Sequence, residues 1–382
     1  MRLLPVDDES SCIETSTKAL SRLTKFLVRR LVKERYIFDA PGWPESLEVN
    51  ERAVILETTL VDILLRLRRN RQGVWEFRKF TDEPLMEALK TVDCHKGTGV
   101  YPVGALMNHS CAPNTHMTFG KYAQIEVRAT ENIRKGAEIT HSYGPHVGDC
   151  KQPERQEKLR DDFFFTCTCV ACTSEEYLNI EKERDALVCG ACHAAVYVQQ
   201  ADVSSNDESA TFSDGTQKCG ECGTPVPVQE QVTSRVTALR SLLDAAKVMA
   251  GTSSTQVMNI NGIAECLIKL EKELHPHNTT LNALRLTVCD IMIKDGRFAD
   301  AEPILKRYVS TEKRHHGVMS LKAAWAWRRL SRVYAQTNSQ MYAVTVALVI
   351  RIYVNHYGRN NVEQLFRDGG MEDYAELLHQ FK

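Results

Sequence analysis

The sequence has little that would attach the chain to nucleic acid or to a membrane. Its 48 basic and 49 acidic residues leave a formal net charge of −1, so no overall field attracts polyanions or anionic lipid. The longest apolar stretch, residues 344–354, is broken by Arg351 and is much shorter than the ~20 residues of a membrane span. The first nine residues are too acidic and too poor in apolar side chains for an export signal. We therefore expect a soluble intracellular protein with no membrane partner and no direct nucleic-acid partner.

Cysteine is scarce in the first 110 residues and clustered between residues 167 and 222. Only Cys12 and Cys94 precede Cys111, whereas seven of the thirteen cysteines lie between residues 167 and 222. In a chain without an export signal, such short spacings indicate zinc binding rather than disulfides. Five cysteines have no partner by spacing and are interpreted as ordinary thiols: Cys12, Cys94, Cys150, Cys266 and Cys289.

Two Cys-x-x-Cys pairs form the clearest metal motif. They are separated by 26 residues, and a glycine follows the first cysteine of each pair, which permits the tight turn of a zinc ribbon. A redox-active pair is the alternative, but two such motifs so close together favour zinc. The predicted ligands are Cys189, Cys192, Cys219 and Cys222.

Residues 101–144 combine unusual polarity with strand patterns. Residues 108–111, Asn-His-Ser-Cys, follow an apolar run with more hydrogen-bonding capacity than a core segment needs. Apolar and polar residues alternate over 122–130, which predicts a strand buried on one face. A turn at Lys135 and Gly136 then leads into a second extended run, residues 139–143.

These features together resemble the SET domain of protein lysine methyltransferases. The tripeptide Ser-Tyr-Gly at 142–144 comes about thirty residues after Asn-His-Ser-Cys, and a Cys-x-Cys-x-x-Cys motif begins at Cys167. Within that superfamily the sequence is most similar to the SET and MYND (SMYD) family, strongly over residues 95–225 and loosely beyond. The resemblance implies a cytoplasmic and nuclear enzyme that transfers a methyl group from S-adenosyl-L-methionine to a lysine of a protein substrate.

The resemblance also implies roles for single residues. Tyr143 would be the catalytic tyrosine and would touch the cofactor. Asn108 and His109 match residues that bind its amino-acid and adenine portions, and Phe165 would stack on the adenine. The plain alternatives are a buried strand tyrosine at 143 and a satisfied core histidine at 109. Phe163 stands where many relatives have a tyrosine, so the lysine channel would lack one hydroxyl.

A first zinc site is implied in the same way. A structural zinc ion binds four protein ligands. In this family the cysteine of the Asn-His-Ser-Cys motif is the fourth ligand of the post-SET zinc site. The implied ligands are Cys111, Cys167, Cys169 and Cys172. Zinc would then fix the wall of the lysine channel to the catalytic core.

The sequence also departs from the family pattern. Relatives have a strand pair with a Gly-x-Gly turn that touches the cofactor, and a MYND zinc module; neither is found here. No clear match exists between Leu89 and Tyr101 for the asparagine-containing strand that precedes their Asn-His-Ser-Cys motif. We therefore expect part of the cofactor site to be missing or supplied in another way.

The flanking segments are predicted to be helical. Over residues 1–90, one helix has leucines at three- and four-residue steps: Leu20, Leu23, Leu27 and Leu31. A second helix is expected from an N-cap at Asn50 to residues 70–73. Its inward side chains would be Val54, Val61, Leu64 and Leu67. An arginine cluster at 66–71 is interpreted as a solvated face rather than a docking patch.

Beyond Gln229 the sequence predicts helices to the end of the chain. The small-residue turn at 295–301 is typical of paired helices in tetratricopeptide-like repeats, and histidines 39 and 40 residues apart are interpreted as repeat punctuation rather than metal ligands. The aromatic residues are expected in the core rather than in a peptide cage: Trp325, Trp327, Tyr334, Tyr342 and Tyr353.

The sequence thus predicts an α+β fold, with a partial SET (β-clip) core, a post-SET zinc site and a zinc ribbon, followed by an all-α tetratricopeptide-like domain. The expected segments are a helical SET insert region (1–92), a core SET domain (93–148), a post-SET zinc region (149–176), a zinc ribbon (177–228) and a C-terminal helical domain (229–382). The predicted activity is protein-lysine N-methylation with two structural Zn²⁺ ions. The alternatives are a catalytically degenerate zinc-binding adaptor that binds proteins through its helical repeats, or a partial product of a longer gene with exposed strand edges.

Overall fold

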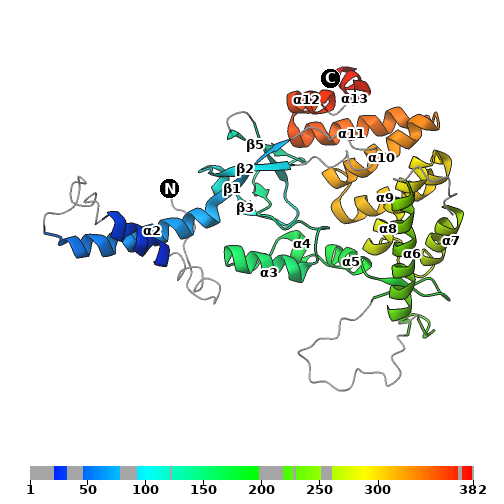
Figure 1. Cartoon of the computed structure of the whole chain (residues 1–382), viewed down its shortest axis with the longest axis horizontal. Helices are drawn as coiled ribbons and strands as arrows, with labels where there is room; N and C mark the ends of the chain where they lie inside the picture. The colour runs from blue at the N-terminus through cyan, green and yellow to red at the C-terminus, as the bar shows by residue number, and fades with distance from the viewer. Residues whose placement is uncertain are drawn as a thin grey trace.

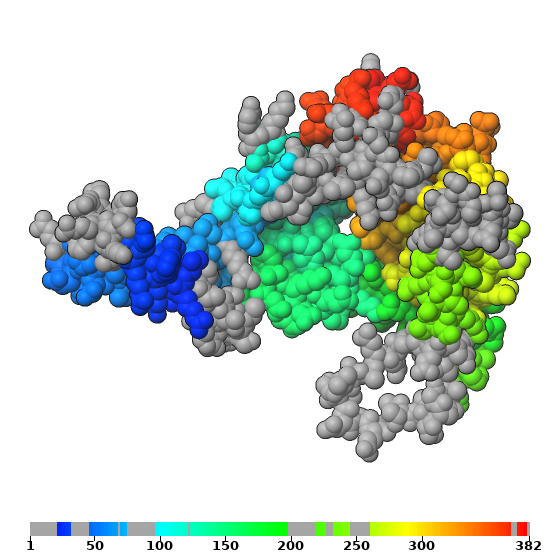
Figure 2. All heavy atoms as spheres, viewed as in Figure 1, coloured from blue at the N-terminus to red at the C-terminus, as the bar shows by residue number. Residues whose placement is uncertain are grey.

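The computed structural model describes residues 21–31, 46–77, 93–120, 123–197, 218–226, 229–250, 260–368 and 372–380. In Figure 1 a group of short strands lies between N-terminal helices on the left and an arc of C-terminal helices on the right. Figure 2 shows the N-terminal helices projecting as an arm from the rest of the molecule. The mixture of strands and helices confirms the predicted α+β class.

Two helices form the projecting arm, residues 21–31 and α2 (Val49–Asn70). The N-cap of α2 is Glu48 and not the predicted Asn50. The backbone N–H of Glu48 donates to the Glu51 carboxylate over 2.9 Å, so a capping box begins the helix. The helix ends at Asn70, within the predicted range.

The four side chains predicted to face inward on α2 do not form a buried face, which corrects that expectation: Val54 and Leu67 are exposed, and Val61 and Leu64 are half-buried. On the first helix, Leu20 lies outside the described residues. Leu23 and Leu27 are 49% and 42% exposed, and Val54 and Leu67 are 62% and 37% exposed. On the first helix the buried side carries Thr24 and Val28 instead. The helical period was predicted correctly, but the period alone does not say which side meets a neighbour.

A strand pair follows α2 and corrects the expectation of helix up to residue 90. β1 (Arg71–Phe77) and β2 (Asp93–Val100) run antiparallel. The glycines of β2, Gly97 and Gly99, explain why the strand was not predicted, because glycine lowers strand propensity and supplies no side chain to the alternating pattern.

The two ends of residues 101–144 meet in a short parallel ladder. β3 (Asn108–His109) and β6 (Thr140–His141) pair so that His109 lies opposite His141. The N–H of Ser110 extends the ladder by donating to the His141 carbonyl over 3.0 Å. The ladder therefore brings two motifs thirty residues apart in sequence to neighbouring positions.

The segment between β3 and β6 forms an antiparallel hairpin of β4 (Thr115–Phe119) and β5 (Ile125–Ala129). The predicted strand is confirmed, but its buried face is not the apolar one. Val127 is 38% exposed, whereas Arg128 is half-buried and donates to the Asn355 carbonyl over 3.3 Å. Among the polar residues of the strand, Arg128 is covered because Asn355 of a C-terminal helix lies against it, whereas Glu126 is exposed.

After β6 come α3 (Gln152–Phe163), α4 (Val170–Thr173), α5 (Glu175–Glu183), β7 (Leu187–Val188) and β8 (Ala195–Val196). Arg155 of α3 is fully buried, and its guanidinium lies 2.5 Å from the Glu181 carboxylate of α5. Removing one member of such a pair would leave the other charge buried without compensation. The pair therefore locks α5 to α3.

The C-terminal region is helical, as predicted, wherever the structure describes it. Its helices are α6 (Gln229–Ala250), α7 (Ile260–Leu270), α8 (Thr279–Lys294), α9 (Phe298–His316), α10 (Leu321–Gln336), α11 (Met341–Tyr357), α12 (Arg359–Asp368) and α13 (Glu372–Gln380). The predicted turn lies between α8 and α9, where Gly296 has φ +75°. Tyr334 and Tyr353 are buried in the core, as expected. Across the described residues, no helix combines the length and apolarity needed to cross a bilayer.

The helical arc contacts the strands and α5 at several places. On α11, His356 packs on His116 of β4 with ring centroids 5.1 Å apart. On α9, Arg314 forms an ion pair with Glu183 at the end of α5, with N and O atoms 2.7 Å apart. The loop after β6 meets α9 at Gly148, which has φ +87° and is buried.

Substituting Gly148 should separate the effect of this contact from that of backbone conformation. A Cβ at residue 148 would lie 2.6 Å from the His315 carbonyl oxygen, whereas Gly136 has the same φ and open space around it. Gly136→Ala should cost about 1 kcal/mol of unfolding free energy from its positive φ. Gly148→Ala should cost about 1–3 kcal/mol more, because the added methyl overpacks the joint. Urea denaturation of both variants measures the difference, and equal midpoints would show that the contact with α9 is loose.

Candidate functional site

Tyr143 lies just after β6, and both its backbone and its side-chain hydroxyl form hydrogen bonds. Its backbone N–H donates to His109 Nδ1 over 3.0 Å, and its hydroxyl donates to the Met107 carbonyl over 2.9 Å. Burial raises the pKa of the Tyr143 phenol, so the phenol is neutral at physiological pH. The residues predicted to converge, Asn108, His109 and Tyr143, do lie on adjoining ends of one ladder.

Aromatic rings surround Tyr143. The rings of Phe163, His141 and Phe165 have centroids 4.8, 5.0 and 6.3 Å from its own. Phe165 also lies 6.1 Å from His109 in an edge-to-face arrangement. Such offset and tilted contacts hold the rings in defined orientations. The segment that precedes the cysteine motif therefore forms one wall of the site.

A pocket opens beside Tyr143. Its lining residues are Arg69, Asn70, Arg71, Gln72, Ala105, His141, Tyr143 and Phe163. The first four come from the end of α2 and the start of β1, so the projecting arm contributes directly to the site. Sequence reasoning did not place any of these four in the site.

Asn70 is the most informative of the missed residues. It is buried at the junction of α2 and β1, and its side-chain amide donates to the Arg66 carbonyl over 2.8 Å. The structure places Asn70 directly before β1, upstream of the stretch between Leu89 and Tyr101 in which no asparagine-containing strand was expected. The sequence signal was the β-prone run at 74–77, which begins four positions after Asn70.

Arg69 supplies a cation to the same wall. Its guanidinium carbon lies 4.1 Å from the ring centroid of Phe164, the residue between the two aromatic side chains of the site. Phe164 has φ +61° at the end of α3, and this left-handed position ends the helix and turns the chain toward the cysteines.

The two side chains predicted to bind the cofactor, Asn108 and His109, differ in their exposure and in their hydrogen bonds. The Asn108 side chain is exposed and donates to a Glu138 carboxylate oxygen over 2.6 Å. The His109 side chain is half-buried, with Nε2 3.2 Å from Cys111 Sγ. Burial lowers the pKa of His109 to about 4, so its imidazole is neutral at pH 7. His109 therefore bridges the backbone of Tyr143 and the first cysteine cluster.

The first cysteine cluster lies directly behind this histidine. Its members, whose Sγ atoms all lie within 4.8 Å of one another, are Cys111, Cys167, Cys169 and Cys172. Hydrogen bonding from Cys111 and Cys172 lowers the pKa of the Cys169 thiol, which favours a thiolate there. Arg155 Nη2 lies 3.7 Å from Cys172 Sγ and adds a buried positive charge. The cluster can hold a metal ion.

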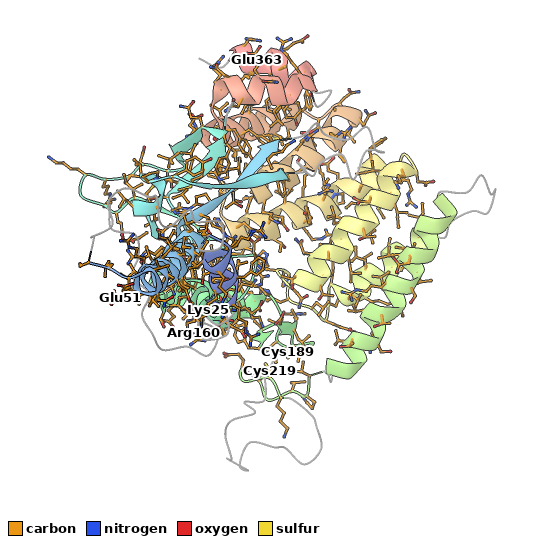
Figure 3. The ribbon with its side chains drawn as sticks, turned by 60° about the vertical axis from the view of Figure 1, so that its left-hand side comes forward. Lys25, Glu51, Arg160, Cys189, Cys219 and Glu363 are labelled. Atoms are coloured by element: carbon orange, nitrogen blue, oxygen red, sulfur yellow. The ribbon has the colours of Figure 1, made fainter. Side chains whose placement is uncertain are left out.

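The second cluster consists of Cys189, Cys192, Cys219 and Cys222, again with all Sγ atoms within 4.8 Å. Figure 3 shows Cys189 and Cys219 close together in the lower part of the view. The Thr224 hydroxyl, 3.2 Å from Cys222 Sγ, lowers the pKa of that thiol to about 6. This cluster can also hold a metal ion, and it lies outside the pocket.

Comparison with known proteins gives an independent result. The family model described as the SET domain matches residues 9–144. The human protein-lysine N-methyltransferase SMYD4 is 45% identical over 98 residues, 25% of this chain and 12% of the relative. The mouse SMYD4 is 29% identical over 239 residues, 62% of this chain and 28% of the relative. The human N-lysine methyltransferase SMYD2 is 43% identical over 82 residues, 22% of this chain and 18% of the relative.

The matched regions are thus a small part of each relative, between 12% and 28% of its length. The residues that match the SET domain model include the ladder and Tyr143. The motif at 108–111, the pocket beside Tyr143 and the cysteine clusters agree with these matches. Residues 9–144 therefore match the SET domain, and the chain is similar to relatives that are named SMYD protein lysine methyltransferases.

Proposed function

We propose that this chain transfers a methyl group from S-adenosyl-L-methionine to a lysine side chain of a protein. The observation that supports this best is the position of Tyr143, held between His109 and Met107 at the edge of a pocket with aromatic walls. A buried tyrosine with a merely structural role would not need a polar pocket next to its ring. The relatives SMYD4 and SMYD2 are named as lysine methyltransferases.

The transfer needs a neutral amine that approaches the methyl carbon in line, in a site that excludes water. S-adenosyl-L-methionine would supply the methyl group on a positively charged sulfur. As the N–C bond forms, the S–C bond breaks and its electron pair stays with the sulfur. The Tyr143 hydroxyl donates a hydrogen bond to the Met107 carbonyl, so its oxygen keeps lone pairs that can accept a hydrogen bond from the amine.

Several residues of this chain fit the cofactor. We infer that the backbone of Asn108 and His109 would hold its amino-acid and adenine portions and that Phe165 would stack on the adenine, beside His109. Asn70 adds a buried amide on the pocket wall. The Asn108 side chain would have to leave Glu138 to take part.

Both cysteine clusters fit structural zinc. A tetrahedral ion with Zn–S bonds of about 2.3 Å puts sulfur atoms about 3.8 Å apart. The Sγ atoms of Cys111 and Cys172 are 3.6 Å apart, as are those of Cys189 and Cys222. Zinc in the first cluster would fix the aromatic wall, which ends two residues before Cys167, to the Asn-His-Ser-Cys motif. A cytoplasmic and nuclear location, and protein partners bound through the helical arc, are proposed as well.

Calorimetry with S-adenosyl-L-methionine is the first test. We expect binding at submillimolar ligand, because the pocket and its aromatic wall are formed in the chain itself. No heat up to millimolar ligand would favour the alternative of a zinc-bearing adaptor without catalytic function.

The variant Tyr143→Phe tests the catalytic residue. Cofactor affinity should stay within about threefold, while methyl transfer to a lysine peptide library should fall by at least about a hundredfold, since one positioned electrostatic group is worth that much. Tyr197→Phe, at an exposed site after β8, is the matched control and should leave both unchanged. Full activity of the Tyr143 variant would remove its hydroxyl from the mechanism.

Metal analysis of the purified protein tests the two clusters. Two zinc ions per chain are expected, and one ion in Cys169→Ser or in Cys222→Ser, because three thiolates do not complete a structural site. Cys266→Ser, outside both clusters, should retain two. A single ion in the unmodified chain would contradict one of the two sites.

A further inference from the structure

The two cysteine clusters differ in the exposure of their side chains. In the first cluster three cysteines are buried and Cys169 is half-buried. In the second cluster Cys189 and Cys219 are buried as well. The other two members of that cluster, Cys192 and Cys222, are exposed. Each knuckle of the second cluster, meaning one Cys-x-x-Cys pair, therefore has one buried sulfur and one that solvent can reach.

The sulfur atoms of the first cluster are also held by neighbouring donors. The backbone N–H of Cys111, a fully buried residue, donates to Cys169 Sγ over 3.3 Å. The buried Arg155 guanidinium lies 3.7 Å from Cys172 Sγ. A reagent that arrives from water has to pass this packing before it reaches a sulfur atom. The first cluster is therefore the protected one.

The second cluster places each exposed sulfur beside a buried sulfur of the other knuckle. Cys222 Sγ lies 3.6 Å from Cys189 Sγ, and the same distance separates Cys192 Sγ from Cys219 Sγ. A disulfide bond requires about 2.05 Å between the two sulfur atoms, so each pair has to close by a small movement only. Both disulfides would join one knuckle to the other.

Links between the knuckles matter because the ribbon is attached to the helical arc. Leu187, Val196 and Val226 of the ribbon belong to the same buried core as α6. The backbone N–H of Val188 donates to the Glu273 carbonyl over 2.8 Å, at the end of α7. The ribbon's own ladder, β7 with β8, has only two residue pairs. Disulfides across the knuckles can therefore keep the ribbon closed over this core when no metal does so.

We propose that a peroxide oxidises Cys192 and Cys222, and that each forms a disulfide with the buried cysteine of the other knuckle, so that the second cluster releases its zinc while the first keeps its own. This inference rests on the zinc proposed for the second cluster. Among cysteines with thiolate character, the exposed ones are oxidised first. Exposure therefore selects the second cluster over the first.

The reaction balances with hydrogen peroxide as the oxidant. The exposed thiolate attacks one peroxide oxygen, so an S–O bond forms, the O–O bond breaks and the departing hydroxide takes up a proton to become water. The buried thiolate then attacks that sulfur, the S–S bond forms, the S–O bond breaks, and a second hydroxide leaves and is protonated. Each disulfide thus consumes one peroxide and two protons and yields two waters. Two disulfides remove all four thiolates, which frees the zinc ion.

Peroxide titration of the zinc-loaded full chain tests the proposal. The chromogenic chelator 4-(2-pyridylazo)resorcinol reports free zinc, and peptide mass spectrometry identifies the disulfides. Two equivalents of peroxide should release one zinc ion per chain and leave the other bound. The disulfides should join Cys189 to Cys222 and Cys192 to Cys219, while the cysteines of the first cluster stay reduced.

A double variant tests the role of exposure. Cys192→His combined with Cys222→His keeps four zinc ligands but removes both exposed thiols. Zinc release by peroxide should then be at least about tenfold slower than in the wild type, since only buried thiolates remain. Cys266→Ser, outside both clusters, is the control and should release zinc at the wild-type rate. A double variant that releases zinc as fast as the wild type would contradict the proposal.

The wild-type measurement separates the remaining outcomes and needs no variant to fold. An untreated chain whose second cluster holds no zinc would overturn the zinc proposed there and this inference together. Zinc in both clusters, with loss from the first cluster before the second or from both at one rate, would overturn this inference alone. Disulfides within the knuckles, such as one between Cys189 and Cys192, would also overturn it, because the ribbon would then lose the links across its knuckles.

Discussion

The parallel ladder of β3 and β6 is the contact on which the site depends. Two residue pairs are too few to be stable alone, and side chains complete the pairing. The Asn114 amide oxygen accepts from the Thr140 N–H over 2.9 Å, and its NH₂ group donates to the Glu138 carbonyl over 2.8 Å. Thr115 donates to the Thr140 carbonyl over 2.8 Å. The motif residues Asn108 and His109 are therefore placed beside His141 and Tyr143 by a network of hydrogen bonds and not by apolar packing.

The first cysteine cluster holds the opposite wall against this ladder. Four thiolates around one divalent ion would carry excess negative charge in a buried place, and Arg155 provides local compensation at Cys172 while donating to the Ala171 carbonyl over 3.0 Å. Through Glu181, the same guanidinium connects the cluster to α5, and α5 meets α9 through Glu183. One chain of charged contacts thus runs from the candidate metal site to the helical arc.

The sequence predicted the parts of the site whose chemistry is local. Cysteine spacing predicted the second cluster and three ligands of the first, whereas Cys111 and the neighbours of Tyr143 followed from the resemblance to the SET domain. What it missed depends on partners far away in the chain. Val127 is exposed, whereas Arg128 is covered because Asn355 of α11 lies against it, and no local pattern contains that information. Asn70 and Arg69 reach the pocket only because β1 follows α2 without a break, where periodicity had predicted helix.

The distance along the chain between Cys111 and Cys172 has a consequence for how the molecule is made. The two sulfur atoms are 3.6 Å apart but belong to residues 61 positions apart in the sequence. During synthesis on a ribosome, Tyr143 and its ladder emerge well before the last cysteine of the cluster. The wall of the pocket therefore cannot close over Tyr143 until that later segment has left the exit tunnel. Until then the aromatic rings of the site face solvent, so this stage of biogenesis is the one most open to chaperones and to loss by aggregation.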